Sequence, residues 1–534
     1  MLRGLAKPVR YAALVSGALP LLAFPSPNLE FIAWFGLVPG MLAIRAAPDW
    51  REAAVRGWWF GTGYLLAALY WLAPEIGPGL LLVAAVVGVL WTGMAIALWR
   101  LLHPPVTVAR ALAALVVVPS YWLVIEWIRS WQALGGPWNV LGVSQWQHPV
   151  VLALAAVGGV WLVSFVLVAA NTAIAIVIVS GRAGLRVLGA AATAVVIAAG
   201  PVAFALTPAA PVTRQVTVAL VQPGLQSSQK EGYLPSVNLT SALARAGTTR
   251  AGTSQAGRPG LIVWGESSVS HLTPPLLVRV RALSAAAGAE ILVNQDSYPR
   301  GRHTKVAVMV GPGGITGEYT KTRLVPFGEY IPFRQALSWL TSISRAAAVN
   351  MTPGTGAHTL TATMPGGRPL TVGVLICFES AFPDMARVDA DHGAQVIVYQ
   401  TSDSTFQDTW ALAQHASLGA LRAAETGRPV VQAALTGDSA AFDPRGRLLS
   451  WEGPSWSGID LVHLGLPPAG SRTPYDRLGD YVPWAAVGIA AIAAAVALLR
   501  LPRRRNHRRA PSVTTSDDPP RSGVLAGSDQ DDTV

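Results

Sequence analysis

The sequence contains a single cysteine, Cys377, among 534 residues, and it is poor in charged residues. One cysteine cannot form an intrachain disulfide, so Cys377 is either a packing residue or a reactive thiol. Asp, Glu, Lys and Arg together make up only 13% of the residues, whereas 51% are hydrophobic. This balance leaves too little polar surface for a soluble globule. The composition therefore predicts a membrane protein.

The apolar residues are concentrated in long runs before residue 207, with one further run near the C-terminus. A helix of about 20 apolar residues crosses the hydrocarbon of a bilayer. The runs lie at 11–25, 31–44, 57–73, 79–99, 111–128, 151–179, 187–207 and 482–500. We expect a membrane domain with seven transmembrane helices at 1–207, a soluble domain at 208–480 and an eighth transmembrane helix at 481–501. Residues 502–534 are predicted to be a disordered tail, first basic and then acidic.

The short loops between the runs predict the orientation in the membrane, because lysine and arginine prefer the cytoplasmic side. Every second loop is basic; these loops contain Arg45, Arg51, Arg56, Arg100, Arg110, Arg182 and Arg186. The opening segment and the segment after the eighth run are also basic. The alternation predicts that both termini are cytoplasmic and that residues 208–480 lie on the outer face. Much of the net charge of +11 then reflects topology, so no nucleic-acid partner is expected.

Residues 208–480 alternate short β-branched runs with helical stretches. The runs are almost continuously apolar, which is typical of strands buried on both faces. They lie at 216–224, 261–268, 289–298, 305–314, 371–380, 394–403 and 428–435. Ala- and Leu-rich stretches with helical spacing lie between several of them. This pattern predicts an α/β domain in which helices cover stacked sheets.

Three chemically capable residues follow these strands or lie on the loops between them: Glu266 after LIVWG, Lys321 in GEYTKTRLVPFGEY and Cys377 in VLICFE. A thiol, a carboxylate and an ammonium group can act as nucleophile, base and electrostatic stabiliser. The thiol needs a base, because free cysteine is mostly protonated at neutral pH. Glu266 accepts the proton if burial raises its pKa. Lys321 then stabilises the charge on a carbonyl oxygen under attack.

Each of these residues taken singly also has a structural explanation. A buried free cysteine is commonly inert packing, and Glu266 or Lys321 alone is explained as a charged residue at a strand end. The histidines His271, His303 and His415 lack metal-ligand spacing, so no metal site is predicted.

The combination of WGESS, YTKTRLVPFGEYIP and LICFES resembles the Glu, Lys and Cys motifs of the nitrilase superfamily. LVPFGEYIP in a chain with eight predicted spans, together with IEWIRSW and GPWNVLGVSQ, is similar to the bacterial apolipoprotein N-acyltransferase family. The resemblance implies a nitrilase-like α-β-β-α sandwich for the outer domain. It also implies that Glu266 is the general base, Lys321 the oxyanion-stabilising residue and Cys377 the nucleophile.

The resemblance extends to accessory positions. Glu329 and Glu379 match accessory site residues, and Trp264 and Phe378 are implied to flank the pocket. The sequence departs from the family at two places. Gly265 stands where the family usually has Pro, and SDSTF stands at 402–406 where the family has Asn-Asp-x-Trp-Phe.

The implied reaction moves a fatty acyl chain from a membrane phospholipid, through a thioester on Cys377, to the N-terminal amine of a diacylglyceryl-cysteine lipoprotein. This is ping-pong chemistry. No metal or organic cofactor is implied. We expect a multi-pass monomer embedded in the bacterial cytoplasmic membrane.

Two other function classes remain open from the sequence. The first is a membrane-anchored nitrilase-type amidase or hydrolase with the same three residues, which would use water as its second substrate and would need only one span. The second is a transporter or structural scaffold, whose spans should carry ionisable groups at the midplane. The first spans contain few such groups; Glu126 and Arg129 lie near the end of the fifth run.

Overall fold

The computed structural model describes most of the chain. The described residues are 8–224, 233–249, 258–298, 301–332, 334–337, 350–406 and 408–499. The predicted tail at 502–534 lies outside them. Residues up to 493 belong to one compact unit, and the last residues of the C-terminal helix belong to a second.

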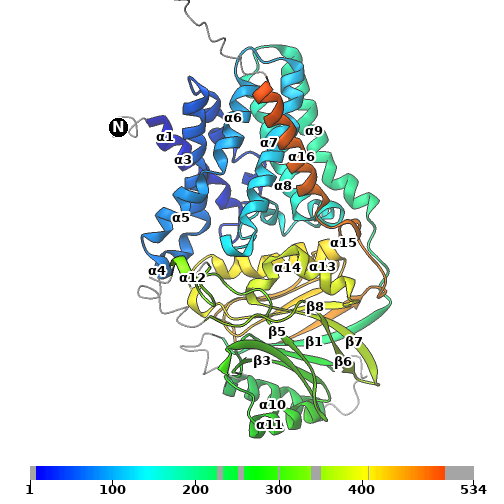
Figure 1. The fold of residues 1–534 in the computed structure, drawn as a ribbon. Coiled ribbons are helices and arrows are strands. Elements are labelled where there is room, and N and C mark those ends of the chain that lie inside the picture. The colour runs from blue at the N-terminus through cyan, green and yellow to red at the C-terminus, as the bar shows by residue number, and fades with distance from the viewer. Residues whose placement is uncertain are drawn as a thin grey trace, which may run out of the picture. The chain divides into compact units, whose positions relative to one another are not determined.

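The N-terminal part is helical, and one more long helix follows the α/β part (Figure 1). The α-helices are α1 (Pro8–Ala18), α2 (Val38–Arg45), α3 (Trp50–Ala68), α4 (Ala73–Ile76), α5 (Gly79–Gly88), α6 (Trp91–Leu102), α7 (Val108–Arg129), α8 (Pro149–Val179), α9 (Ala183–Leu206) and α16 (Tyr481–Leu499). Among the described residues, α7, α8, α9 and α16 are long and apolar enough to cross a membrane. The pair α5 and α6, bent by 41°, would make a fifth crossing.

The apolar run at 31–44 does not form one continuous helix. A 3-10 helix, Glu30–Trp34, is followed by α2, which has 8 residues and a proline in its first turn. A helix of this length extends about 12 Å, whereas the hydrocarbon is about 30 Å thick. The count of eight spans therefore stays a prediction.

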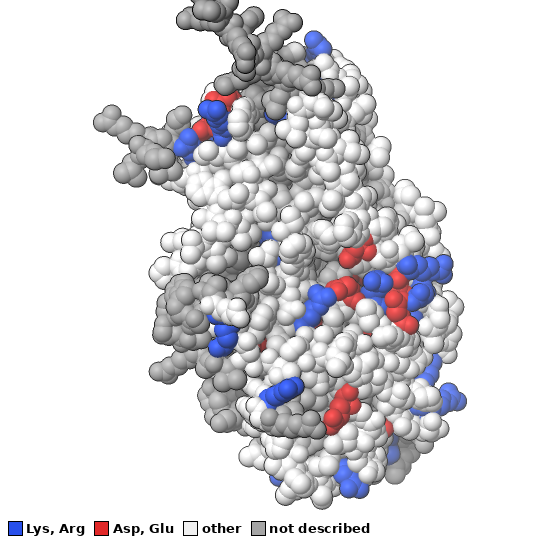
Figure 2. Space-filling model, viewed as in Figure 1, with Lys and Arg blue, Asp and Glu red and all other residues white. Residues whose placement is uncertain are grey.

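The surface of the helical part is apolar. On the face seen in Figure 2, few charged side chains interrupt it between a small group at its far end and the α/β part. The exposed side chains include Leu81, Leu82, Val86, Leu112, Ile178, Val187, Val195, Ile197, Val202, Trp484 and Ile492. An apolar surface of this extent is typical of contact with lipid.

The α/β part contains two six-stranded sheets. The first has the order β12-β1-β2-β3-β4-β5 and the second β11-β10-β9-β8-β7-β6. The strands are β1 (Arg214–Gln222), β2 (Leu261–Trp264), β3 (Glu290–Ser297), β4 (Thr304–Gly311), β5 (Gly314–Thr320), β6 (Thr359–Met364), β7 (Arg368–Ile376), β8 (Val396–Thr401), β9 (Val430–Ala434), β10 (Ser439–Phe442), β11 (Leu448–Glu452) and β12 (Gly458–Leu466). In each sheet three central strands are parallel, namely β1 to β3 and β7 to β9.

The two sheets pack face to face and helices cover both outer faces. Leu220 and Val263 of the first sheet share a buried core with Val374 and Val398 of the second. Helices α10 (Tyr233–Thr249) and α11 (Pro274–Ala287) cover the outer face of the first sheet, and α13 (Pro383–Asp391) and α14 (Ala411–Thr426) lie on that of the second (Figure 1). The short helices α12 (Arg334–Leu337) and α15 (Pro474–Leu478) complete the part. The predicted α-β-β-α sandwich is confirmed.

Helix α14 connects the sandwich to the helical part. Helix α8 is interrupted at Gly158 and Gly159, where the backbone leaves the helical region. Just after this break, the amide of Val160 donates a hydrogen bond of 2.7 Å to Glu425 Oε1 on α14. Near the start of α14, the amide of Trp410 donates to the hydroxyl of Tyr70, 2.8 Å away. The sandwich is therefore attached to the helices at both ends of α14.

Helices α1 and α3 approach so closely that only glycine fits at their contact. A Cβ atom at Gly63 would overlap the carbonyl oxygen of Leu14, and one at Gly17 would overlap that of Phe60. We expect Gly63→Ala to lower the free energy of unfolding by about 1–3 kcal/mol, because the helices must move apart. Gly184→Ala is the control, since nothing lies within 4 Å of a Cβ there. Thermal unfolding in detergent measures both; an equal effect of the two substitutions would contradict this packing.

Candidate active site

Cys377 lies at the end of β7, where the chain turns into a 3-10 helix, Cys377–Ala381. Its φ angle is +50°, a left-handed conformation that is uncommon for residues other than glycine and is often found at functional sites. The residues on either side, Ile376 and Phe378, are buried, whereas Cys377 is partly exposed. The turn therefore places the side chain of Cys377 against the core between the two sheets while leaving part of the residue exposed.

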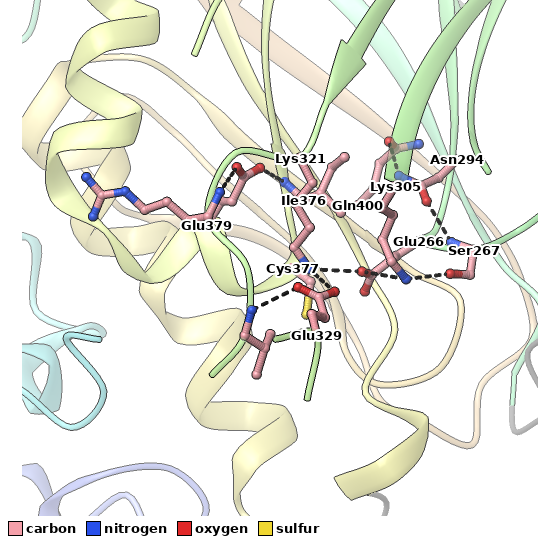
Figure 3. A network of polar contacts seen from close by, with 12 residues as sticks. Glu266, Ser267, Asn294, Lys305, Lys321, Glu329, Ile376, Cys377, Glu379 and Gln400 are labelled. Carbon is pink, nitrogen blue, oxygen red and sulfur yellow. Dashed lines mark hydrogen bonds and ion pairs between the residues drawn. The ribbon is translucent and has the colours of Figure 1, made fainter. Parts of the chain in front are cut away.

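Glu266 lies two residues after β2, and its carboxylate contacts two lysines. Oxygen Oε1 of Glu266 is 3.3 Å from Nζ of Lys321 and 3.2 Å from Nζ of Lys305. The amide of Glu266 donates to the carbonyl of Thr401 on the second sheet. Figure 3 shows the Glu266 carboxylate between the two ammonium groups, with Lys321 on the side of Cys377 and Lys305 on the side of Ser267. The structure thus brings together the three residues that the sequence nominates.

Lys321 immediately follows β5 and is 1% exposed. Its ammonium group donates to Glu329 Oε1 at 2.7 Å, in addition to its contact with Glu266. Glu329 Oε2 accepts a hydrogen bond from the amide of Val325, which fixes the carboxylate in its loop. Lys321 is therefore held between two carboxylates next to the thiol.

Lys305 was not singled out from the sequence. It lies on β4, is buried, and donates to Ser267 Oγ at 2.8 Å besides its contacts with Glu266 and Asp296. A lysine within the otherwise apolar run KVAVMVG was the only available signal. Such a charge in a strand buried on both faces requires a partner.

The pKa values follow from these contacts. Burial raises the pKa of Glu266, but Lys305 and Lys321 outweigh burial and lower it to about 2. The condition stated from the sequence, a pKa of Glu266 raised by burial, is therefore not met in the net direction, because Lys305 supplies a second cation. Burial raises the pKa of Cys377 well above its ordinary value, and the charge of Glu266 adds to this effect. At neutral pH the resting site holds a carboxylate and a protonated thiol.

Lys321 remains an ammonium group in this environment. Burial lowers its pKa, but Glu266 and Glu329 together raise the pKa of Lys321 well above its ordinary value. A permanent cation is thus held beside the thiol, where it can stabilise the negative charge on a carbonyl oxygen under attack.

Glu379 links the turn at Cys377 to the loop that follows β5. Its Oε1 accepts from the Tyr319 hydroxyl and from the amides of Thr322 and Arg323, at 2.7–2.9 Å. Its Oε2 accepts from the amide of Ile376 at 2.8 Å. The carboxylate therefore fixes Lys321 relative to Cys377.

The two predicted aromatic residues lie in different places. Trp264 is fully buried in the outer core; its indole donates to Thr240 of α10 and packs against Tyr233. The structure does not place the Trp264 side chain among Glu266, Lys321 and Cys377. Phe378 follows Cys377 and packs edge-on against Phe382, with ring centroids 4.9 Å apart.

The structure bears on both departures from the family motifs, Gly265 and the stretch 402–406. A Cβ atom at Gly265 would overlap the amide of Leu435, so the backbone before Glu266 requires glycine. In the stretch 402–406, Asp403 contacts the buried His415, with 2.9 Å between Asp403 Oδ1 and the ring nitrogen Nδ1. Cys377 Sγ, an oxygen of Asp403 and a ring nitrogen of His415 all lie within 4.8 Å of one another.

A chain of side-chain amides supports the loop that carries Glu266. Ser267 has φ +54°, and its amide donates to Asn294 Oδ1 at 2.9 Å. Asn294 in turn donates to Gln400, whose amide group donates to the carbonyl of Trp264. Neither Asn294 nor Gln400 was picked out from the sequence, because each follows an apolar run without a distinguishing motif.

Two family models match the chain. Residues 16–173 match the apolipoprotein N-acyltransferase N-terminal domain. Residues 304–466 match the carbon-nitrogen hydrolase family. This range includes Lys305 on β4 and Cys377 at the end of β7. The nitrilase-like nature of the sandwich is therefore confirmed.

The chain also resembles curated proteins over most of its length. It is 31% identical to the apolipoprotein N-acyltransferase of Allorhizobium ampelinum, over 92% of this chain and 96% of that protein. It is 34% identical to the apolipoprotein N-acyltransferase of Sinorhizobium fredii, over 86% of this chain and 90% of that protein. A third relative of the same name, from Sinorhizobium medicae, is 30% identical over 87% of this chain and 91% of that protein.

The shared carboxylate predicts a pH effect. Lys305→Met removes one of the two cations on Glu266, so the pKa of Glu266 should rise by about 1 to 3 units. The carboxylate then becomes protonated at higher pH, and the acidic limb of the pH–rate profile of the enzyme should move to higher pH. Asp296→Asn is the control, because it removes a partner of Lys305 but leaves both lysines on Glu266. An unmoved acidic limb in Lys305→Met would contradict the assignment.

Proposed function

Because the chain belongs to the apolipoprotein N-acyltransferase family, we propose that it transfers a fatty acyl chain from a membrane phospholipid to the N-terminal amine of diacylglyceryl-cysteine lipoproteins. One observation carries the proposal: the nucleophile turn packs directly against the helical part. A Cβ atom at Gly136, in the loop after α7, would lie 2.8 Å from the ring of Phe378 and 2.9 Å from that of Phe382. The thiol is thus next to elements of the apolar part of the molecule.

The position of the Cys377 turn next to the apolar helices suits a lipid substrate. A soluble domain would have to extract the lipid at a cost of about 0.8 kcal/mol for each CH₂ group exposed to water. Helices with apolar outer surfaces avoid this cost by keeping the acyl chains in the bilayer. An amidase acting on a soluble substrate would gain nothing from them.

In the first half-reaction, Cys377 Sγ attacks the ester carbonyl carbon of the phospholipid while its proton passes to the carboxylate of Glu266. The carbonyl oxygen becomes negative, and the ammonium group of Lys321 stabilises it. Collapse breaks the ester C–O bond. The leaving alkoxide takes the proton from Glu266, which leaves a thioester on Cys377 and a lysophospholipid.

In the second half-reaction, the neutral α-amine of the lipoprotein attacks the thioester carbon. Glu266 accepts the proton that the nitrogen loses as the amide forms, and the C–S bond breaks. The proton then returns to the sulfur, which restores the thiol. Glu329 supports both halves by holding Lys321 at 2.7 Å.

The placement of basic residues supports an outward-facing sandwich. Arg10 and Arg56 contact Glu52 at the start of α3, and Arg45 donates to the carbonyl of Leu102 at the end of α6. The opposite end of α3 leads to Tyr70, which contacts the sandwich. If the basic end is cytoplasmic, the sandwich lies on the outer face.

The covalent step has a direct test. Purified protein is incubated with phospholipid carrying a labelled acyl chain, and we expect a labelled adduct that hydroxylamine releases. Cys377→Ala should form none. Equal labelling of wild type and Cys377→Ala would refute the thioester. With an adduct present, transfer to a diacylglyceryl-cysteine peptide supports the transferase, whereas release of free fatty acid alone would favour the hydrolase.

The single cysteine also makes the topology testable. In a Cys377→Ala background, Glu318→Cys in the sandwich and Gly181→Cys between α8 and α9 each introduce one exposed thiol. A membrane-impermeant maleimide should label the first in intact spheroplasts and the second only after permeabilisation. The reverse pattern would place the sandwich in the cytoplasm.

A further inference from the structure

A second charged pair lies beside the nucleophile, apart from Glu266 and Lys321. His415, on α14, is 2% exposed, and its Nδ1 is 2.9 Å from Asp403 Oδ1. Its other ring nitrogen, Nε2, is 3.2 Å from the backbone carbonyl oxygen of Cys377 and 2.9 Å from Ser380 Oγ. The imidazole therefore contacts the residue that bears the reacting thiol.

The partners of the ring determine its protonation state. A carboxylate oxygen and a backbone carbonyl oxygen both only accept hydrogen bonds. A neutral imidazole carries one proton, so one of these acceptors would face a lone pair. With Nδ1 protonated, Ser380 could donate to Nε2, but the carbonyl of Cys377 would remain unsatisfied on that side. An imidazolium gives a proton to both acceptors.

We propose that His415, held as an imidazolium by Asp403, is a positioning residue that fixes the left-handed turn at Cys377 and offsets the negative charge that develops on its sulfur. The inference rests on the proposed covalent role of Cys377. The hydrogen bond to the carbonyl of Cys377 restrains a backbone conformation that is otherwise unfavourable. The cation lies on the α14 side of the thiol and acts in addition to Lys321, which contacts Glu266.

The charged groups around the ring agree with this state. Burial lowers the pKa of His415, but Asp403, and more weakly Glu266, raise it above its ordinary value. The indole of Trp138, in the loop after α7, covers the ring with centroids 5.6 Å apart. Its Nε1 donates to Gln414, the neighbour of His415 on α14. The pair is thus enclosed between the sandwich and the helical part.

The test uses alkylation of Cys377 by iodoacetamide, which reports on the thiolate without acyl donor or acceptor. His415→Gln removes the cation and leaves Asp403 unpaired near the sulfur. The thiol pKa should then rise by about one unit, and alkylation at a fixed pH below that pKa should slow about tenfold. The control is His463→Gln on β12, which should alkylate at the wild-type rate.

A double variant separates charge from packing. His415→Gln combined with Asp403→Asn removes the unpaired anion as well, so alkylation should recover to within about threefold of wild type. A purely structural role predicts that the double variant is at least as slow as the single one. Recovery supports the proposal; a wild-type rate in His415→Gln, or no recovery in the double variant, overturns it.

A second measurement does not depend on the variants' stability. The ¹⁵N shifts of ring-labelled histidine in the wild-type protein should show both nitrogens of one histidine protonated at a pH where exposed histidines are neutral. A spectrum with only neutral rings at that pH would overturn the proposal. Failure of the acyl-labelling experiment with success here would contradict the acyl-transfer function while leaving the positioning of the thiol intact.

Discussion

One carboxylate oxygen of Glu266 is shared by two buried lysines, and the site depends on this contact. A buried charge is costly unless it is paired and hydrogen-bonded. The loop after β2 supplies the carboxylate, whereas β4 and the end of β5 supply the two ammonium groups. The thiol comes from β7 of the other sheet. The cluster can therefore form only when the two sheets pack face to face, which ties catalysis to the core of the sandwich.

The helical part is connected to this cluster by the loop after α7. Glu126 accepts hydrogen bonds from Trp122 and from the amide of Leu141, and Arg129 donates to the carbonyl of Trp138. These buried groups hold the loop that covers Phe378 and His415. This structural role accounts for the ionisable side chains at the end of a predicted span. A transport pathway, one of the alternatives left open by the sequence, is not needed to explain them.

The sequence predicted seven strands, β1 to β4 and β7 to β9, because each is almost continuously apolar. It did not reveal β5, β6, β11 and β12, which alternate or are partly exposed and so lack that signal, or β10, which is buried but only four residues long. The roles of Glu266 and Cys377 were implied by family motifs rather than by periodicity. Lys305 reverses the expected shift in the pKa of Glu266, and its effect depends on β4 lying close enough to reach the loop after β2, a tertiary contact that no local pattern encodes.

The resting site keeps a protonated thiol beside an ionised glutamate. Because Cys377 is the only cysteine, the S–H stretching band in the infrared spectrum reports on it alone. The band should be present at neutral pH, absent in Cys377→Ala, and replaced by a thioester carbonyl band after phospholipid is added. A resting wild-type protein without the S–H band would contradict this account.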